Sequence, residues 1–324
     1  MFKYKNVYVT GSIAYDTIMN FPSEFQDYFH PEKLHQINVS FVVNKLEKQL
    51  GGTGTNIAYN IKHVTCNMKH LNVHLFGSIG KDGKEFINFF RKNKIDASGV
   101  IVDKELYTSA GSVITDIKNN QIWGFYYGAS ERIPYIDFKK LNKKTDLFVI
   151  SANHKNSFLY FQREAIKNKI PYFYDPGMTL TWITDKDLKQ GVMNCRYLVG
   201  NDYEIAMILK RLNVSINRLI DTGVIVITTL GEEGVKYEER SVVGNRHAYS
   251  VLVKGYKIKK MVDPTGAGDA LRGGFVAGLL MGYSTKNCLK LGNVMASFAI
   301  EKYGTVNHRP TLEEIKKRMM KLKS

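Results

Sequence analysis

Three absences restrict what this 324-residue chain can be. The apolar runs, such as residues 275–281 and 224–227, fall well short of the ~20 residues that a membrane-spanning helix needs. The amino terminus carries no apolar segment followed by a small-residue cleavage site, so we expect no export signal. Cys66, Cys195 and Cys288 are too few and too widely separated for a disulfide scaffold or a CxxC pair. These observations predict a cytoplasmic protein with reduced thiols and no membrane partner.

Acidic residues are scarce beside basic ones: 30 Asp and Glu face 46 Lys and Arg, for a formal net charge of +16. Such a charge suits a nucleic-acid binder, because Lys and Arg neutralise phosphates. The basic residues are nevertheless scattered, and residues 315–323 have the pattern of an amphipathic helix with a solvated lysine face. We therefore favour a solvated basic surface and expect no specific nucleic-acid partner. A nucleic-acid binder would instead show tight, steeply salt-dependent duplex binding.

The residues that are abundant predict a large core. Hydrophobic residues make up 44% of the chain and aromatic residues 12%, which excludes a disordered or fibrous protein. Short β-branched or aromatic runs alternate with segments of helical periodicity. The expected strands are residues 6–10, 73–78, 146–151, 171–174, 197–200 and 224–229. The expected helices are residues 56–63, 84–93, 157–168, 203–211 and 270–281. This alternation predicts an α/β fold with a mostly parallel central sheet and helices on both faces.

Two stretches, at about 17–50 and 105–130, break this rhythm. In the second, residues 112–117 and 121–126 flank a turn-like Asn119-Asn120 pair. We interpret both stretches as strands of a small sheet that leaves the main layer and covers a site as a lid. No repeat or low-complexity linker divides the chain, so residues 1–324 are expected to form one domain. An exposed lid edge would allow two copies to pair as a homodimer.

The strongest chemical signal is the segment Asp-Pro-Thr-Gly-Ala-Gly-Asp at residues 263–269, followed by an apolar helix. A glycine-rich turn at a helix start presents free backbone N–H groups and the positive end of the helix dipole, which suits a phosphoryl group. Asp269 falls in the first helical turn and could accept the proton of an attacking hydroxyl. Alternatively, Asp269 is a helix cap and the glycines form an ordinary strand-to-helix turn.

Two further segments could bind a substrate. Gly51-Gly52-Thr53-Gly54-Thr55-Asn56 precedes a helix, so its backbone could approach a ligand and Asn56 could donate and accept hydrogen bonds. A surface loop is the alternative for this segment. Asp16 follows the first strand, at the edge of the sheet where ligands gather in parallel α/β proteins. A lone aspartate there is more often a turn residue.

Two other segments could bind a nucleotide. Asn201 and Glu204 are three residues apart at a helix start, so they share a face and could reach a hydrated magnesium ion. Helix capping is the alternative for this pair. The segment Thr229-Leu230-Gly231-Glu232-Glu233-Gly234 follows a buried strand, and its glycines would let the backbone approach a nucleotide. Such a loop alone is weak evidence.

In their order and identity these segments resemble the ribokinase-like (PfkB-type) family of sugar and nucleoside kinases. The resemblance spans nearly the whole chain and includes Gly11-Ser12 and Gly80-Lys81-Asp82-Gly83. It implies a three-layer α/β kinase with a β-sheet lid, which transfers the γ-phosphate of ATP from a Mg²⁺ complex to a substrate hydroxyl. The chain has no GxxxxGK[ST] segment, so glycine turns, a helix amino terminus and magnesium must stabilise the phosphates instead.

The resemblance also implies residue roles. Asp269 is the base, and the anion hole is formed by the backbone N–H groups of Gly266, Ala267 and Gly268. Substrate is bound by Asp16, Gly51, Gly52 and Asn56. ATP is bound by Asn201, Glu204, Thr229, Gly231, Gly234 and Asn293, and Glu204 also reaches Mg²⁺ through water. A K⁺ ion beside the anion hole, as in some relatives, is left open.

Within the family, several strings are similar to the bacterial adenosine kinase-type branch, which implies the 5′-hydroxyl of adenosine or a related nucleoside as acceptor and a role in purine salvage. These strings are residues 11–16, 56–60, 120–129, 175–177 and 303–310. Aromatic residues of the lid could stack on a purine or could form the lid's own packed face. These residues are Phe41, Trp123, Phe125 and Tyr126.

Three positions depart from the family pattern. Leu271, Ser130 and Val306 stand where phenylalanine, methionine or asparagine, and glutamine are common. They leave the chemistry intact but weaken the purine assignment. A ribokinase-like or fructokinase-like sugar kinase is therefore the alternative. A non-catalytic nucleotide- or sugar-binding regulator is a further alternative, because a fold does not determine a function.

Overall fold

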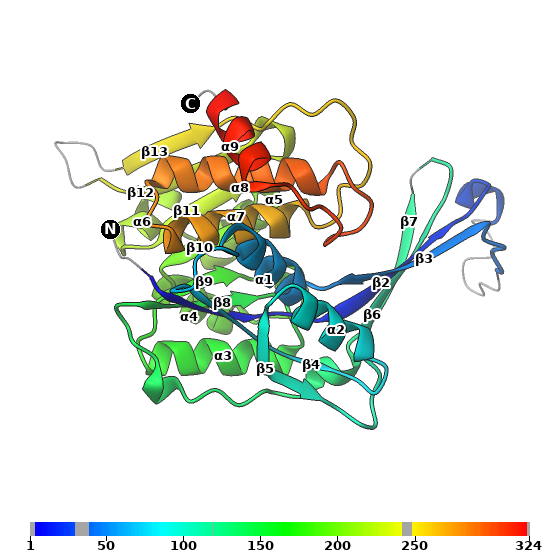
Figure 1. Ribbon diagram of the computed structural model, residues 1–324, viewed down its shortest axis with the longest axis horizontal. Coiled ribbons are helices and arrows are strands. Elements are labelled where there is room, and N and C mark those ends of the chain that lie inside the picture. The colour runs from blue at the N-terminus through cyan, green and yellow to red at the C-terminus, as the bar shows by residue number, and fades with distance from the viewer. Residues whose placement is uncertain (1–3, 30–38, 119, 242–247, 323–324) are drawn as a thin grey trace.

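The computed structural model describes residues 4–29, 39–118, 120–241 and 248–322. Asn119 and the side chain of Trp123 lie outside the described residues. A nine-stranded sheet forms the centre of the molecule, with strand order β13-β12-β11-β10-β9-β8-β1-β4-β5. A second sheet of four strands, in the order β3-β2-β6-β7, projects from one side (Figure 1).

The strands from β11 across to β5 pair in parallel, and β12 and β13 add an antiparallel edge. These strands are β1 (Asn6–Thr10), β4 (Asn72–Ile79), β5 (Asp96–Val102), β8 (Asp146–Ser151), β9 (Tyr172–Asp175), β10 (Tyr197–Asn201), β11 (Ile225–Thr229), β12 (Val235–Arg240) and β13 (Ala248–Val253). The mostly parallel sheet predicted from the alternating sequence pattern is confirmed.

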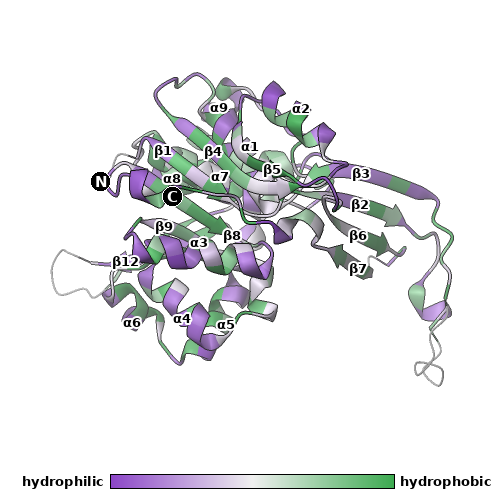
Figure 2. Ribbon diagram, turned by 90° about the horizontal axis from the view of Figure 1, so that it is seen from below, coloured by the Kyte–Doolittle hydropathy of each residue, from purple (hydrophilic) through white to green (hydrophobic). Residues whose placement is uncertain are grey.

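Helices cover both faces of the large sheet, which makes three layers (Figure 2). On one face lie α1 (Thr53–Val64), α2 (Lys84–Lys92), α7 (Ala267–Leu280), α8 (Thr285–Ala299) and α9 (Leu312–Lys321). On the other face lie α3 (Lys155–Lys167), α4 (Asp185–Asn194), α5 (Asp202–Leu212) and α6 (Ile216–Asp221). In the described part of the chain, none of these helices has both the length and the apolarity needed to span a membrane.

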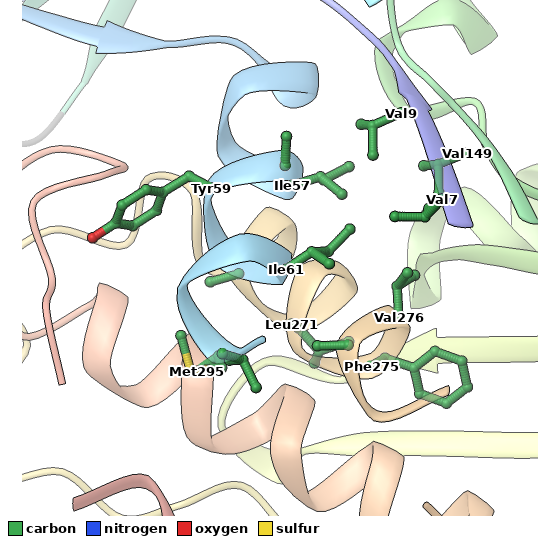
Figure 3. Packing of buried hydrophobic residues seen from close by; sticks show 14 of the residues in the cluster. Val7, Val9, Ile57, Tyr59, Ile61, Val149, Leu271, Phe275, Val276 and Met295 are labelled. Carbon is green, nitrogen blue, oxygen red and sulfur yellow. The ribbon is translucent and has the colours of Figure 1, made fainter. Parts of the chain in front are cut away.

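Strand residues alternate between two apolar clusters, one on each face of the sheet. In β8, Leu147 and Val149 pack with α1 and α7, whereas Phe148 and Ile150 pack with the α3 side. Figure 3 shows the first cluster, in which Ile57 and Ile61 of α1 meet α7 and the sheet residues. Because α1 and α7 pack on the same strands, their amino termini are brought to the same edge of the sheet.

The small sheet consists of β2 (Ala14–Asn20), β3 (Lys45–Gly51), β6 (Ser109–Thr115) and β7 (Gln121–Tyr126). Strand β2 pairs in parallel with β6 and antiparallel with β3, so two segments far apart in the sequence share one sheet. The turn between β6 and β7 is held by Asp116, whose carboxylate accepts the backbone N–H groups of Lys118 and Asn120 at 2.9 and 2.8 Å. We call this four-stranded sheet the lid.

Candidate active site

The carboxyl ends of the parallel strands carry polar residues along one edge of the large sheet. Thr10 ends β1, Ser151 ends β8, Asp175 ends β9, Asn201 ends β10 and Thr229 ends β11. The register pairs Asn201 with Thr229 and Ser151 with Asp175, so these residues are neighbours across the sheet. Ligands of open α/β sheets bind at this edge.

Helix α7 begins at this edge behind a strained turn. Gly266 is the N-cap residue and has φ 78°, a left-handed conformation that favours glycine. Among the described residues, the backbone N–H groups of Gly266, Gly268 and Asp269 form no hydrogen bond, whereas that of Ala267 donates to the Pro264 carbonyl at 3.2 Å. The turn therefore offers free donors to an anion at the positive end of the helix dipole. The Asp269 N–H is a donor that the sequence did not suggest.

The Asp269 carboxylate lies half-buried in the first turn of α7 and faces α1. The Asn56 side-chain amide donates to Asp269 Oδ2 at 2.8 Å. The Thr305 hydroxyl lies 2.8 Å from Asn56 Oδ1 and 3.1 Å from the Leu50 carbonyl, so it can fix the orientation of the Asn56 amide. Burial raises the pKa of Asp269; the nearby Arg272 cation and the Asn56 amide oppose this shift, while the Glu204 carboxylate adds to it. A carboxyl group with a raised pKa is suited to accept a proton.

The glycine-rich loop before α1 is bound to the ends of two strands. The Thr53 hydroxyl donates to the Ala152 carbonyl at 2.9 Å, and the Thr53 N–H donates to the Ser12 hydroxyl at 3.1 Å. Gly52 has φ 89°, and a Cβ there would lie 2.6 Å from the Ala14 backbone nitrogen. The loop is thus a rigid element whose conformation requires glycine.

Asp16 lies within strand β2 of the lid, and its carboxylate lies beside Gly51 at the end of β3. A Cβ at Gly51 would collide with Asp16 Oδ2, so the glycine leaves the space that the carboxylate fills. Within the described parts of the chain the Asp16 carboxylate makes no hydrogen bond. Burial raises the pKa of Asp16 to about 7, and the nearby Asp269 and Asp263 carboxylates add to the shift. The carboxylates of Asp16 and Asp269 are therefore close enough to influence each other.

A cavity of about 460 Å³ separates the lid from the segment before α7. Its walls include Asp16, Val113 and Asp116 from the lid, and Asp263 and Tyr303 from the main body. This size is within the range of small-molecule sites.

Asn201 and Glu204 form a reciprocal capping box at the start of α5. The Glu204 N–H donates to Asn201 Oδ1 at 2.7 Å, and the Asn201 N–H donates to Glu204 Oε2 at 2.8 Å. The structure therefore contains the capping interaction that was the alternative for this pair. Capping still leaves one oxygen available to a ligand, because Glu204 Oε1 makes no hydrogen bond to described residues. The pair lies at the carboxyl end of β10, on the edge of the sheet described above.

The loop after β11 is open on its outer side. Gly231 has φ 58°, and a Cβ there would meet no atom within 4 Å, so a ligand could approach the backbone. Gly234 has φ 108°, and a Cβ there would lie 2.5 Å from the Gly255 nitrogen. Asn293 is buried on α8, where its side-chain amide donates to the Val253 and Lys254 carbonyls at 2.9 and 3.1 Å. Asn293 thus holds the chain beside this loop, and a direct contact with nucleotide stays a prediction.

Two charged residues that the sequence did not single out for a role lie at the centre of this site. Arg272 of α7 forms an ion pair with Asp175, with Nε 2.7 Å from Oδ2 and Nη2 2.7 Å from Oδ1. Its Nη2 also lies 4.0 Å from Glu204 Oε2. An arginine at helical spacing i+3 from the candidate base was the available signal, because residues three apart share a helix face.

The lid aromatic residues named from the sequence lie in different places. Phe41 packs in a cluster at the tip of the lid with Phe21, Phe25 and Tyr28, at ring-centroid distances of 4.8, 5.1 and 5.9 Å. The alternative of the lid's own packing therefore applies to Phe41. Phe125 and Tyr126 are exposed on β7. None of these three residues lines the cavity beside Asp16.

Residues 10–312 match the family described as pfkB family carbohydrate kinase, so the chain belongs to this family. The ribokinase-like family and fold predicted from the sequence are both confirmed.

The curated and structural relatives include proteins named nucleoside kinases. The protein of this name from Methanocaldococcus jannaschii is 28% identical over 295 residues, which cover 90% of this chain and 93% of that protein. That from Methanothermobacter thermautotrophicus is 28% identical over 319 residues, with coverage of 97% and 95%. The structure of Burkholderia thailandensis nucleoside kinase in complex with inosine has a TM-score of 0.82 and 25% identity, and covers 98% of this chain and 97% of that one. These relatives support a nucleoside or sugar kinase.

Proposed function

We propose that this protein transfers the γ-phosphoryl group of ATP to the 5′-hydroxyl of adenosine or a related nucleoside. The observation that carries the proposal is the Asp269 carboxylate, which lies in the same helical turn as the free backbone donors of Gly266 and Gly268. Phosphoryl transfer needs an aligned nucleophile and neutralised charge more than covalent chemistry. A base and an anion site within one turn supply both.

The acceptor hydroxyl would lie between Asp269 and the lid. The cavity beside Asp16 is the place for the rest of the substrate, and the unpaired Asp16 carboxylate is suited to accept hydrogen bonds from sugar hydroxyls. Asn56, whose amide donates to Asp269, would orient the base. The relatives named nucleoside kinases favour a nucleoside in this cavity.

ATP would lie along the sheet edge from α7 to the loop after β11. Its phosphates would meet the amino termini of α5 and α7, and its nucleoside part would approach the open backbone at Gly231. Among the described residues, no group of three or more His, Cys, Asp or Glu side chains could bind a metal ion. Mg²⁺ would therefore be held mainly by the phosphates and water, with Glu204 as an outer ligand, which matches its preference for keeping several waters.

The same chemistry on a sugar hydroxyl is the second candidate, because the family is described as one of carbohydrate kinases. Both candidates use Asp269 and the anion site in the same way. They differ in what fills the cavity between the lid and the main body. A panel of acceptors therefore separates them.

Two further proposals concern the setting of this activity. Cys66, Cys195 and Cys288 are all free in the structure, which supports a cytoplasmic enzyme. We also propose a homodimer formed through the lid, whose exposed strand residues include Leu46, 63% exposed, on β3. Exposed apolar residues on an edge strand are a common means of pairing between chains.

The test is ATP consumption by the purified protein with Mg²⁺ across adenosine, inosine, other nucleosides, ribose and fructose. We expect the highest kcat/KM with a purine nucleoside, and we expect Asp269→Asn to lose at least about 10³-fold in kcat while still binding ATP. Asp221→Asn, which removes an exposed carboxylate at the end of α6, is the matched control. Turnover by Asp269→Asn at the wild-type rate would exclude Asp269 as the base, and preferential turnover of a sugar would replace the proposed acceptor.

A further inference from the structure

A buried arginine forms the centre of the charged groups behind the anion site. Arg272 is 7% exposed and forms an ion pair with Asp175, which is 2% exposed. Nη2 donates a hydrogen bond to Oδ1 at 2.7 Å, whereas Nε lies 2.7 Å from Oδ2 without the geometry of a hydrogen bond. Burying such an ion pair contributes little net stability, because the cost of desolvating two charges offsets their attraction. Stability alone is therefore a weak reason for this pair.

The guanidinium lies directly beneath the turn that binds the phosphoryl group. A Cβ at Gly268 would lie 2.6 Å from Arg272 Nη1, so a side chain at this position would displace the guanidinium. Nη2 donates to Asp175, whereas Nε and Nη1 make no hydrogen bond to the described residues. The guanidinium thus lies against the backbone of the turn at Gly268.

Arg272 also joins the two halves of the site. Through Asp175 it is attached to the end of β9, and Nη2 lies 4.0 Å from Glu204 on α5, the nucleotide side. Asp269 lies one turn earlier on the same helix, on the substrate side. In the proposed arrangement, Asp175 and Glu204 belong to elements that do not contact the substrate. Arg272 therefore connects the base, Asp269, to the nucleotide side of the site.

The charges around Asp269 come from several elements. Arg272 is the cation among the groups that shift the pKa of Asp269, and it opposes the rise caused by burial. Burial also raises the pKa of Asp175 to about 6, which Arg272 opposes. The carboxylates that interact electrostatically with Asp269 are Asp16 of β2, Asp175 of β9 and Glu204 of α5, and Asp263 before α7 in turn acts on Asp16.

We propose that Arg272 is a positioning residue for phosphoryl transfer, which holds Gly268 and Asp269 in alignment with Glu204 and supplies the positive charge behind the base. It acts through these groups and not by contact with substrate. The inference rests on the proposed function and assigns a role to a residue outside the family resemblance described above.

The test compares the pH dependence of kcat/KM in variants that change this pair in opposite senses. Arg272→Met removes the positive charge, so the pKa of Asp269 rises and the acid limb should move to higher pH, with kcat about 10²-fold lower. Asp175→Asn removes a negative charge, so the acid limb should move to lower pH. Arg272→Lys keeps the charge without the planar fork, so the acid limb should stay while kcat falls.

The matched control is Arg318→Met. Arg318 of α9 forms an ion pair with Glu301 at 2.6 Å and packs on the Phe298 ring, far from the anion site along the chain. Its loss should reduce stability but leave the pH profile unchanged. The proposal is overturned if the Arg272→Met profile coincides with that of wild type, or if its kcat falls no further than that of Arg318→Met.

Two features keep this result separate from the proposed function. If Arg272→Met does not fold, the acid limb of the Asp175→Asn pH profile is the test. A move of this limb to lower pH supports the proposal, and no move or a move to higher pH overturns it. If the wild-type protein phosphorylates none of the acceptors, the proposed function fails, and a ¹³C NMR titration of the Asp269 carboxyl still tests the inference. That titration should move to higher pH in Arg272→Met, and an unmoved titration overturns the role of Arg272.

Discussion

The ionised Asp16 carboxylate should destabilise the ligand-free protein, and Asp16→Asn should remove this destabilisation. The carboxylate lies on strand β2 between the lid and the main body, with no hydrogen bond to described residues and with Asp269 and Asp263 nearby. Burial, supported by these two carboxylates, raises the pKa of Asp16 from 3.8 to about 7. A proton is therefore bound by the folded protein in a range where the unfolded chain has lost it.

The sign of the effect follows from this difference. Below pH 3.8 both states are protonated and the residue contributes nothing. Between that pH and about pH 7, each pH unit costs the folded state about 1.36 kcal/mol, because only the unfolded chain ionises freely. Above pH 7 both states are ionised, and the penalty stays constant at up to about 4 kcal/mol.

Urea unfolding of the wild type and Asp16→Asn, measured from pH 5 to pH 8, tests this reasoning. We expect the variant to be the more stable protein, and its advantage to grow by about 3 kcal/mol across this range. Asp27→Asn, which removes an exposed carboxylate in the segment between β2 and β3, should show no such trend. A constant difference between wild type and Asp16→Asn at all pH values would refute the argument, because the penalty would not arise from ionisation.

The same variant should lose function. Substrate hydroxyls that donate to Asp16 stabilise its ionised form, so binding should release a proton near pH 7 and the wild-type KM should fall as the pH rises through 7. Asp16→Asn should raise KM and abolish this pH dependence. A site that is destabilising when empty and favourable when filled is a common trade between stability and activity.

Two remaining predictions concern Thr305 and the lid. Thr305→Val removes the hydroxyl that lies 2.8 Å from Asn56 Oδ1, and we expect about tenfold lower kcat, because a mis-oriented amide no longer donates to Asp269. A Thr305→Ser variant should retain the activity. Equal kcat values for Thr305→Val and wild type would refute the role of Thr305 in orienting Asn56. For the homodimer, light scattering should give twice the chain mass for wild type and one chain mass for Leu46→Glu, whereas Leu252→Glu on β13 should remain dimeric; a monomeric wild type would exclude the dimer.

Most of the central sheet could be predicted because its strands are buried on both faces. Residues 6–10 and 146–151 are continuous or alternating apolar runs, and the structure confirms both with the same bounds. Strands β12 and β13 were not predicted, because they lie at the antiparallel edge of the sheet and carry charged or exposed residues such as Lys236 and Leu252. Such strands are determined by pairing with β11 and not by a local apolar pattern.

The glycine segments of the site were visible in the sequence, because a positive φ or a close approach admits few other residues. Gly52, Gly231, Gly234 and Gly266 all have positive φ. No role was assigned to Arg272 from the sequence, because its i+3 spacing from Asp269 is only a local signal and its ion pair is with Asp175 on β9, 97 residues earlier in the chain. A contact of that separation is created by the parallel sheet and leaves no periodic signal.

The helix start at Asn201 shows why the two interpretations of a motif need not exclude each other. From the sequence, a capping pair and a phosphate-side pair were alternatives, and the structure contains the reciprocal capping box. The cap uses Glu204 Oε2 and leaves the carboxylate facing the guanidinium of Arg272. Because the cap fixes the Glu204 rotamer, the carboxylate has a defined position before any ligand binds. In the proposed arrangement local capping would therefore preorganise this charge for the nucleotide, and the cost of ordering it would be met during folding instead of during binding.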